Sequence, residues 1–320
     1  MEHVPRQNCQ FPHPRILLLS PPLHFITGTE LKADELHALL RRAQEVKAAP
    51  RNGARPLLGR NIALLFEKPS TRTRVSFQVG IQQLGGHALL MRSEELQLAR
   101  GESVRDTALV LSRYVDAIVV RHGRHAVIEE LAKYAEIPVV NALTPVHHPC
   151  QALADLLTLR ERFGNLEGLR VAYVGDGNNV LQSLMLVGAR AGVEVVGATP
   201  QELRPDPDLV AQAGELASVV DDPREAAAGA HALYTDVWVS MGDEGDASRR
   251  RELLAPYRLD AGLLAHARDD AVVMHCLPAH PGEEITEDLL YGERSAVWDQ
   301  AENRLHAQKA LMERLLPDPL

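Results

Sequence analysis

The sequence predicts an α/β protein with two tandem lobes, each built on a doubly wound parallel sheet, and a C-terminal helix that returns to the first lobe. Three observations support this prediction. Strand-like and helix-like patterns alternate along the chain, as in parallel sheets covered by helices. The alternation breaks once, at Gly164-Asn165, and then restarts. The 320 residues also exceed the length of one ordinary domain.

The first lobe begins with apolar residues at helical spacing over residues 30–47, a pattern that Pro50 ends. The predicted strands are 61–66, 87–91, 117–121 and 138–143, and the predicted helices are 70–84, 103–114, 126–135 and about 149–163. In the helix from residue 70 we expect a buried side formed by Val75, Phe77, Val79, Ile81 and Leu84.

The second lobe repeats the alternation in segments 170–176, 178–192, 193–199, 231–238, 271–278 and 295–299. The polar stretch 242–251 is expected to be a mobile loop. A last helix, 301–316, is long enough to cross back to the first lobe. The expected units are therefore an extension at 1–22, domains at 23–163 and 164–299, and the C-terminal helix at 300–320.

Composition excludes several classes of protein. With 34 basic and 43 acidic residues the formal charge is −9, which argues against a nucleic-acid binder. Cys9, Cys150 and Cys276 are odd in number and lack CxxC spacing, so we expect no disulfide framework or structural zinc, and a cytoplasmic location. No apolar run approaches the ~20 residues that span a bilayer. The apolar run at 16–19 is shorter than the ~7–15 residues of a signal peptide core, so residues 1–22 are expected to be a flexible extension.

Ligands of open α/β sheets bind beyond the carboxyl ends of strands, and the segment PSTRTR lies at such a position. Ser70 is expected to cap the following helix, whose free N–H groups and dipole favour an anion. Thr71 and Thr73 add hydroxyl groups, and Arg72 can donate two parallel hydrogen bonds to a phosphate. Arg74 lies roughly 200° away around the helix and cannot face the same ligand. A capped, solvated turn is the alternative interpretation.

PSTRTR, together with HPCQ at 148–151 and HCLP at 275–278, resembles the carbamoyltransferase family over about residues 23–316. The stretch DVWVSMG at 236–242 is similar to the ornithine-using members. The resemblance implies that the first domain binds carbamoyl phosphate and the second binds L-ornithine. The products would be L-citrulline and phosphate, in arginine biosynthesis or the arginine deiminase route. The resemblance also implies a homotrimer with active sites between subunits, and no metal or organic cofactor.

The resemblance assigns roles residue by residue. Carbamoyl phosphate would contact Ser70, Thr71, Arg72, Thr73, Gln97, Arg121, His148, Pro149, Cys150, Gln151, Cys276, Leu277 and Arg304. Ornithine would contact Asn179, Asp236, Ser240 and Met241. The catalytic set would be Arg121, His148, Cys276 and Asp236, with His148 donating to the carbonyl oxygen and Cys276, coupled to Asp236, orienting the amine and helping to remove its proton. Gln97 would come from a neighbouring subunit.

Other functions remain open at this point. Putrescine, N-acetylornithine or aspartate could replace ornithine as the acceptor. A nicotinamide-dependent dehydrogenase is a remote alternative, because VGDGNNV has Val180 where the third glycine belongs and no acidic residue ends the next strand. A metal-binding or regulatory protein is another alternative, although no standard zinc spacing is present. Its ligands would come from His147, His148, Cys150, His275, Cys276 and His280.

Overall fold

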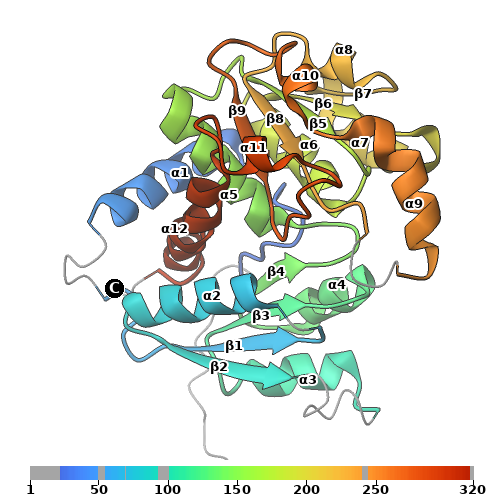
Figure 1. Cartoon of the computed structure of the whole chain (residues 1–320). Coiled ribbons are helices and arrows are strands. Elements are labelled where there is room, and N and C mark those ends of the chain that lie inside the picture. Colours follow the sequence, from blue (N-terminus) through green and yellow to red (C-terminus); the bar gives the residue numbers. More distant parts are fainter. Residues whose placement is uncertain (1–21, 50–54, 69, 93–100, 240–243, 318–320) are drawn as a thin grey trace, which may run out of the picture.

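The first lobe is a four-stranded parallel sheet with strand order β2-β1-β3-β4 (Figure 1). This computed structural model describes residues 22–49, 55–68, 70–92, 101–239 and 244–317. The strands are β1 (Asn61–Phe66), β2 (His87–Arg92), β3 (Ala117–Arg121) and β4 (Val139–Leu143). The helices are α1 (Ala33–Ala48), α2 (Thr71–Gln83), α3 (Val104–Leu111), α4 (His125–Tyr134) and α5 (Pro149–Phe163). Strand β1 is an almost continuous apolar run because helices cover both of its faces.

The second lobe is a five-stranded parallel sheet with strand order β7-β6-β5-β8-β9. Its strands are β5 (Arg170–Val174), β6 (Glu194–Ala198), β7 (Ala217–Val220), β8 (Ala232–Thr235) and β9 (Val272–His275). Its helices are α6 (Asn179–Arg190), α7 (Pro207–Ala213), α8 (Pro223–Ala227), α9 (Ala247–Leu254), α10 (Ala261–Leu264) and α11 (Glu287–Leu290).

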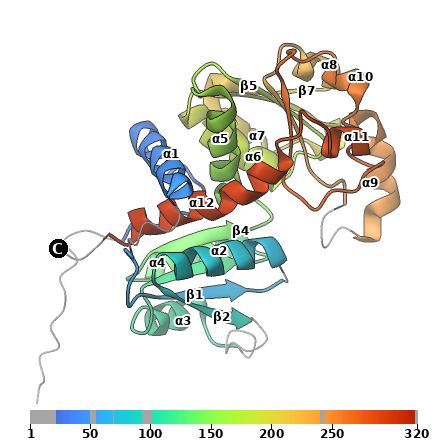
Figure 2. The same cartoon turned by 60° about the vertical axis from the view of Figure 1, so that its left-hand side comes forward.

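The last helix, α12 (Val297–Leu315), lies between the lobes and packs on α1, α2 and α5 (Figure 2). One core cluster therefore runs through both lobes. It includes Phe77 of α2, Leu153 of α5, Tyr234 of β8 and Leu311 of α12, each at most 1% exposed.

The predicted fold class is confirmed, with local differences that include the following three. Segment 295–299 is not a separate element, because Ser295 forms only an isolated bridge to Val273 and α12 begins at Val297. The described part of 242–251 is not a loop throughout, since α9 begins at Ala247. Val75 is 46% exposed whereas Phe77 is buried. Residues two apart lie roughly 200° apart around a helix, so these two could not share one buried side.

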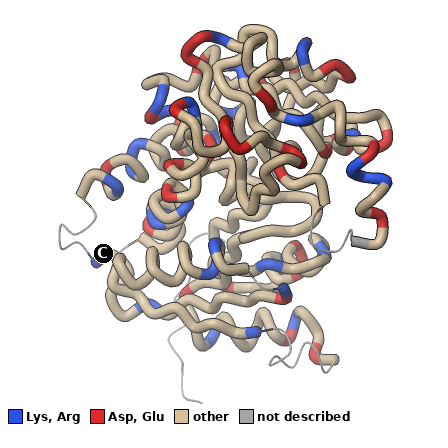
Figure 3. Tube along the Cα trace, in the orientation of Figure 1, with Lys and Arg blue, Asp and Glu red and all other residues tan. Residues whose placement is uncertain are grey.

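Charged residues are interspersed along both lobes, with basic and acidic positions mixed (Figure 3). This mixture is the pattern of an ordinary solvated surface. None of the helices in the described ranges is long and apolar enough to cross a membrane.

Candidate active site

A cavity of about 910 Å³ lies between the lobes, at the carboxyl ends of both sheets. The residues that follow strands β1, β3 and β4 line it from the first lobe, and those that follow β5, β8 and β9 line it from the second. Helix α12 contributes Arg304. Two sheets thus present their ligand-binding edges to one space, which can hold two small molecules side by side.

The start of α2 forms one wall of this cavity. Ser70 stands at the N-cap position with extended backbone, but its side chain caps no N–H group of the helix. Its Oγ instead accepts from Nη1 of Arg121 at 3.0 Å. The predicted N-cap position of Ser70 is therefore confirmed, although its hydroxyl makes no capping hydrogen bond. The N–H groups of the first turn have no acceptor within the helix, an arrangement that favours binding of an anion.

Three arginines, Arg72, Arg121 and Arg304, line the same wall. Nη2 of Arg304 donates to the Oγ1 of Thr73 at 2.6 Å, and the Nε atoms of Arg121 and Arg304 are buried without hydrogen-bond partners in the described ranges. Burial, and then the positive charges of Arg304 and Arg72, lowers the pKa of Arg121 to about 10. This concentration of positive charge and unused donors is complementary to a phosphate dianion.

His148 stands at the N-cap of α5, between the arginines and the second lobe. Its backbone N–H donates to the Oγ of Ser183 in α6 at 2.7 Å. Complete burial, and then the charges of Arg304 and Arg121, lowers the pKa of its imidazole well below the ordinary histidine value. The ring is therefore neutral at pH 7 and carries one N–H that can donate to a carbonyl oxygen.

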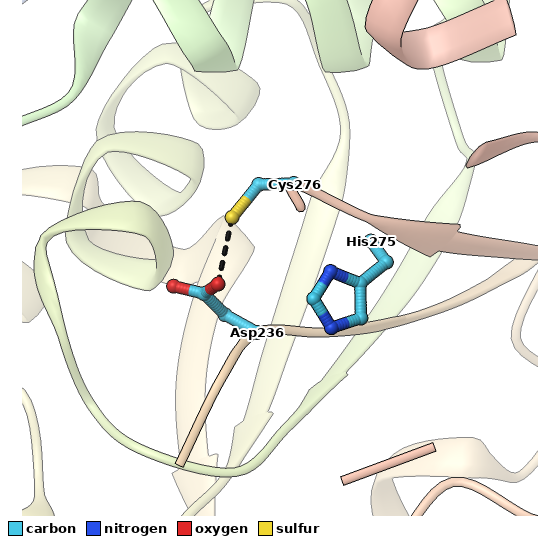
Figure 4. A group of neighbouring side chains, drawn as sticks. All are labelled: Asp236, His275 and Cys276. Carbon is cyan, nitrogen blue, oxygen red and sulfur yellow. Dashed lines mark hydrogen bonds between the residues drawn. The ribbon is translucent and has the colours of Figure 1, made fainter. Parts of the chain in front are cut away.

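Asp236 and Cys276 face the cavity from the second lobe and contact each other (Figure 4). The Sγ of Cys276 donates to Oδ1 of Asp236 at 2.7 Å, and Oδ2 accepts from Nδ2 of Asn178 at 2.9 Å. Burial, and then the Asp236 carboxylate, raises the pKa of Cys276 well above its ordinary value. Cys276 is thus a thiol donor at neutral pH and not a thiolate nucleophile.

The turn that carries Cys276 is organised around His275. The N–H of Leu277 donates to Nδ1 of His275 at 2.9 Å. Nε2 therefore carries the ring proton and donates to Oε1 of the buried Glu284 at 3.1 Å. Ligand atoms of Asp236, His275 and Cys276 lie within 4.8 Å of one another. Because both nitrogens of His275 are engaged in hydrogen bonds, this group is poorly suited to hold a metal ion.

The structure brings most of the predicted site residues together. The cavity is lined by Ser70, Thr71, Arg72, Thr73, Arg121, His148, Asn179, Asp236, Cys276, Leu277 and Arg304. Pro149, Cys150 and Gln151 are buried in the first turn of α5 and are not among the residues that line the cavity. Gln97, Ser240 and Met241 lie outside the described residues. The amide Nδ2 of Asn179 donates to the backbone oxygen of Thr144 at 2.6 Å, so it bridges the two lobes.

Two residues with evident positions in the site were missed by the sequence analysis. Asn178 caps α6 through its Oδ1, and its Nδ2 holds Asp236. An asparagine before a helix, next to Asn179, is a cap signal that could have indicated it. Arg250 of α9 donates from Nε to the oxygen of Trp238 at 2.9 Å and pairs with Asp176. Nothing local in a run of arginines indicates such a contact.

Comparisons with known proteins agree with this geometry. Residues 23–161 match the carbamoyl-P binding domain of the aspartate/ornithine carbamoyltransferases, and residues 167–315 match the Asp/Orn binding domain of the same family. The chain belongs to the aspartate/ornithine carbamoyltransferase family.

Within that family, several similar proteins are ornithine carbamoyltransferases. The ornithine carbamoyltransferase of Acidothermus cellulolyticus is 54% identical, over 92% of this chain and 96% of that protein. That of Methanoculleus marisnigri is 52% identical, over 91% and 96%. The solved structure of ornithine carbamoyltransferase from Pyrococcus furiosus superposes with a TM-score of 0.89 at 45% identity, covering 93% of this chain and 99% of that one.

Proposed function

We propose that this protein transfers the carbamoyl group of carbamoyl phosphate to the δ-amine of L-ornithine, giving L-citrulline and phosphate. One observation supports this most directly. Three arginines, of which Arg72 belongs to the first turn of α2, and an Asp–Cys pair line one cavity. The first is complementary to a phosphate and the second to an amine. The similarity to ornithine carbamoyltransferases gives the same acceptor.

Carbamoyl phosphate binds with its phosphate at the start of α2. Thr71 and Arg72 contact the phosphate oxygens there, and Arg121 and Arg304 add charge from β3 and α12. The carbonyl oxygen of the carbamoyl group lies between Arg121 and His148. A neutral imidazole donor and a guanidinium stabilise negative charge that develops on this oxygen during attack.

Ornithine binds on the side of the second lobe, held by Asp236 and Asn179, with Ser240 and Met241 completing the contacts. Its neutral δ-amine attacks the carbamoyl carbon, and the bond from that carbon to the phosphate oxygen breaks. The Asp236–Cys276 pair orients the amine and helps to remove its proton, which ends on the departing phosphate. Closure of the lobes excludes water and limits hydrolysis of carbamoyl phosphate.

The same proposal includes the assembly and location of the protein. We expect a homotrimer in which Gln97 of a neighbouring subunit reaches the carbamoyl phosphate, and a cytoplasmic location. The trimer is tested by light scattering, where a monomer with full activity would contradict a shared site. The residues around Gln97 are tested by mixing inactive Arg72→Ala and Gln97→Ala subunits, which regain activity only if sites are shared.

The acceptor is tested by measuring the ureido product and phosphate together. Carbamoyl phosphate is supplied with L-ornithine, L-aspartate, putrescine or N-acetylornithine. Citrulline from ornithine alone supports the proposal. Turnover of another acceptor would be consistent with the assigned phosphate-binding residues but would contradict the assignment of ornithine as the acceptor. Absence of turnover with all four would overturn the proposed activity.

A further inference from the structure

Before its last residue, Arg190, helix α6 has three polar residues, Asn179, Gln182 and Ser183, in an otherwise apolar sequence. The mechanism above gives no role to the last two. Their spacing of i, i+3 and i+4 places all three residues on one face of the helix. Gln182 is 7% exposed and Ser183 is 0% exposed, and neither lines the cavity. A buried polar face of this kind requires hydrogen-bond partners from another segment.

These partners are backbone atoms of the turn that links β4 to α5. Nε2 of Gln182 donates to the backbone oxygen of Val146 at 2.9 Å. The Oγ of Ser183 accepts from the backbone N–H of His148 at 2.7 Å. Asn179 contacts the same turn through its own amide, as described above. Three side chains of the second lobe therefore hold a turn of the first lobe that ends at His148.

The hydrogen bond to Ser183 bears on the direction of the His148 side chain. The backbone oxygen of His148 accepts from the N–H of Gln151 at 3.0 Å, so the peptide group after His148 is fixed by its own helix. The peptide group before His148 is fixed by Ser183. Nδ1 of the imidazole is buried and has no hydrogen-bond partner in the described ranges. The backbone and the surrounding packing, rather than a hydrogen bond at Nδ1, therefore direct the ring.

The start of α6 is a well-ordered support for this contact. Oδ1 of Asn178 accepts from the N–H groups of Val180 and Leu181 at 2.9 and 3.3 Å, which caps the first turn of the helix. Oε1 of Gln182 accepts from the N–H of Asp206 at 2.9 Å, so both ends of this carboxamide are engaged. Because residues 180–188 are all buried, the helix has little freedom to move away from the turn.

We infer that Ser183 is a positioning residue for the transfer reaction, which holds the start of α5 so that the imidazole of His148 faces the carbonyl oxygen of the carbamoyl group. The inference rests on the proposed function of the cavity. Ser183 touches no substrate atom and acts only through His148. Ser183→Ala leaves the N–H of His148 buried without its acceptor, which favours a rearrangement of the turn. A misplaced imidazole stabilises the developing negative charge less well, so the main effect falls on kcat.

Steady-state kinetics of the full-length protein with carbamoyl phosphate and ornithine test this role. We expect Ser183→Ala to lower kcat by about tenfold, less than the roughly 10²–10³ that the loss of a complete oxyanion donor costs. The KM for carbamoyl phosphate should change by less than about threefold, because the phosphate is bound at the start of α2. In a His148→Ala background the same substitution should leave kcat unchanged, since no imidazole remains to be positioned.

Met185→Ala is the matched control on the same helix. Met185 lies roughly 200° from Ser183 around α6, and it packs beside Gly197 of β6, with 1% of its surface exposed. Met185→Ala should lower the urea midpoint of unfolding and leave kcat unchanged under conditions where the protein is folded. If Ser183→Ala does not fold, Gln182→Met releases the same turn at Val146 and replaces it in the kinetic comparison with His148→Ala.

Three outcomes would overturn the inference. An unchanged kcat in Ser183→Ala would show that the contact does not position His148. Equal fractional losses in the wild-type and His148→Ala backgrounds would show that Ser183 acts on another group. A loss of kcat in Met185→Ala as large as that in Ser183→Ala would assign the effect to the stability of α6. In each case the wild type still forms citrulline, so the proposed function stands. A wild type that forms no citrulline would overturn the proposed function and the inference with it.

Discussion

The cluster of Arg72, Arg121 and Arg304 should make the ligand-free protein less stable than a variant that lacks one of these charges. Arg121 is held among Arg72 and Arg304, and its pKa is lowered to about 10. Compared with the pKa of a fully solvated arginine, this lowering corresponds to about 3 kcal/mol of unfavourable free energy for the charged form at pH 7. Replacing Arg121 by methionine removes that charge and also the hydrogen bond to Ser70, which contributes about 1 kcal/mol. The net expectation is a gain of about 2 kcal/mol in the free energy of unfolding.

The assay is urea unfolding followed by circular dichroism, with and without orthophosphate. In phosphate-free buffer the Arg121→Met protein should unfold at higher urea than the wild type. Phosphate at 100 times its dissociation constant should stabilise the wild type by about 2.7 kcal/mol and the variant much less. Arg74→Met is the matched control, because Arg74 does not line the cavity. An Arg121→Met protein that is less stable than the wild type, or that keeps the full response to phosphate, would refute the reasoning.

Three further expectations concern acidic and thiol groups. Asp236→Asn should raise the KM for ornithine at least tenfold, since a charged hydrogen bond contributes about 1.5–3 kcal/mol; an unchanged KM in steady-state kinetics would remove Asp236 from the ornithine site. Because the pKa of Cys276 is raised well above its ordinary value, iodoacetamide at pH 7.5 should alkylate it much more slowly in the native protein than in urea, and equal rates by mass spectrometry would argue against the raised pKa. Burial raises the pKa of Asp155 to about 7, so the folded state binds this proton more tightly than the unfolded chain does. Stability should therefore decline as the pH rises from about 4 to 7, and Asp155→Asn should flatten that part of the profile of unfolding free energy against pH. An identical slope in the variant would assign the decline to other groups.

Local patterns in the sequence were sufficient for the fold class and for much of the cavity lining. Strand β1 is apolar and PSTRTR follows it, so a ligand site after that strand could be predicted from adjacent residues. The rest depends on residues far apart in the chain. Arg121 donates to the hydroxyl oxygen of Ser70, which lies 51 positions earlier, and Gln300 donates to Asp155 across 145 positions. No periodic pattern in the sequence predicts such pairs, because they form only when the sheets and α12 pack together.

The order of the strands within each sheet also could not be predicted from local sequence patterns. The sequence shows alternating strands and helices, but β1 lies between β2 and β3 in the first sheet, and β5 lies between β6 and β8 in the second. Short edge strands are the hardest to detect. Strand β7 is only partly buried and has four residues, so it carries little of the apolar signal that marks β1.

The position of α12 has a consequence for how the chain matures during synthesis. Arg304 reaches Thr73 from 231 positions later, and the same helix covers α1, α2 and α5. A nascent chain that has released both lobes from the ribosome still lacks the last arginine of the anion site and still exposes the apolar sides of three helices. A message truncated shortly before residue 297 would therefore give a nearly full-length product that is inactive and a substrate for chaperones and proteases.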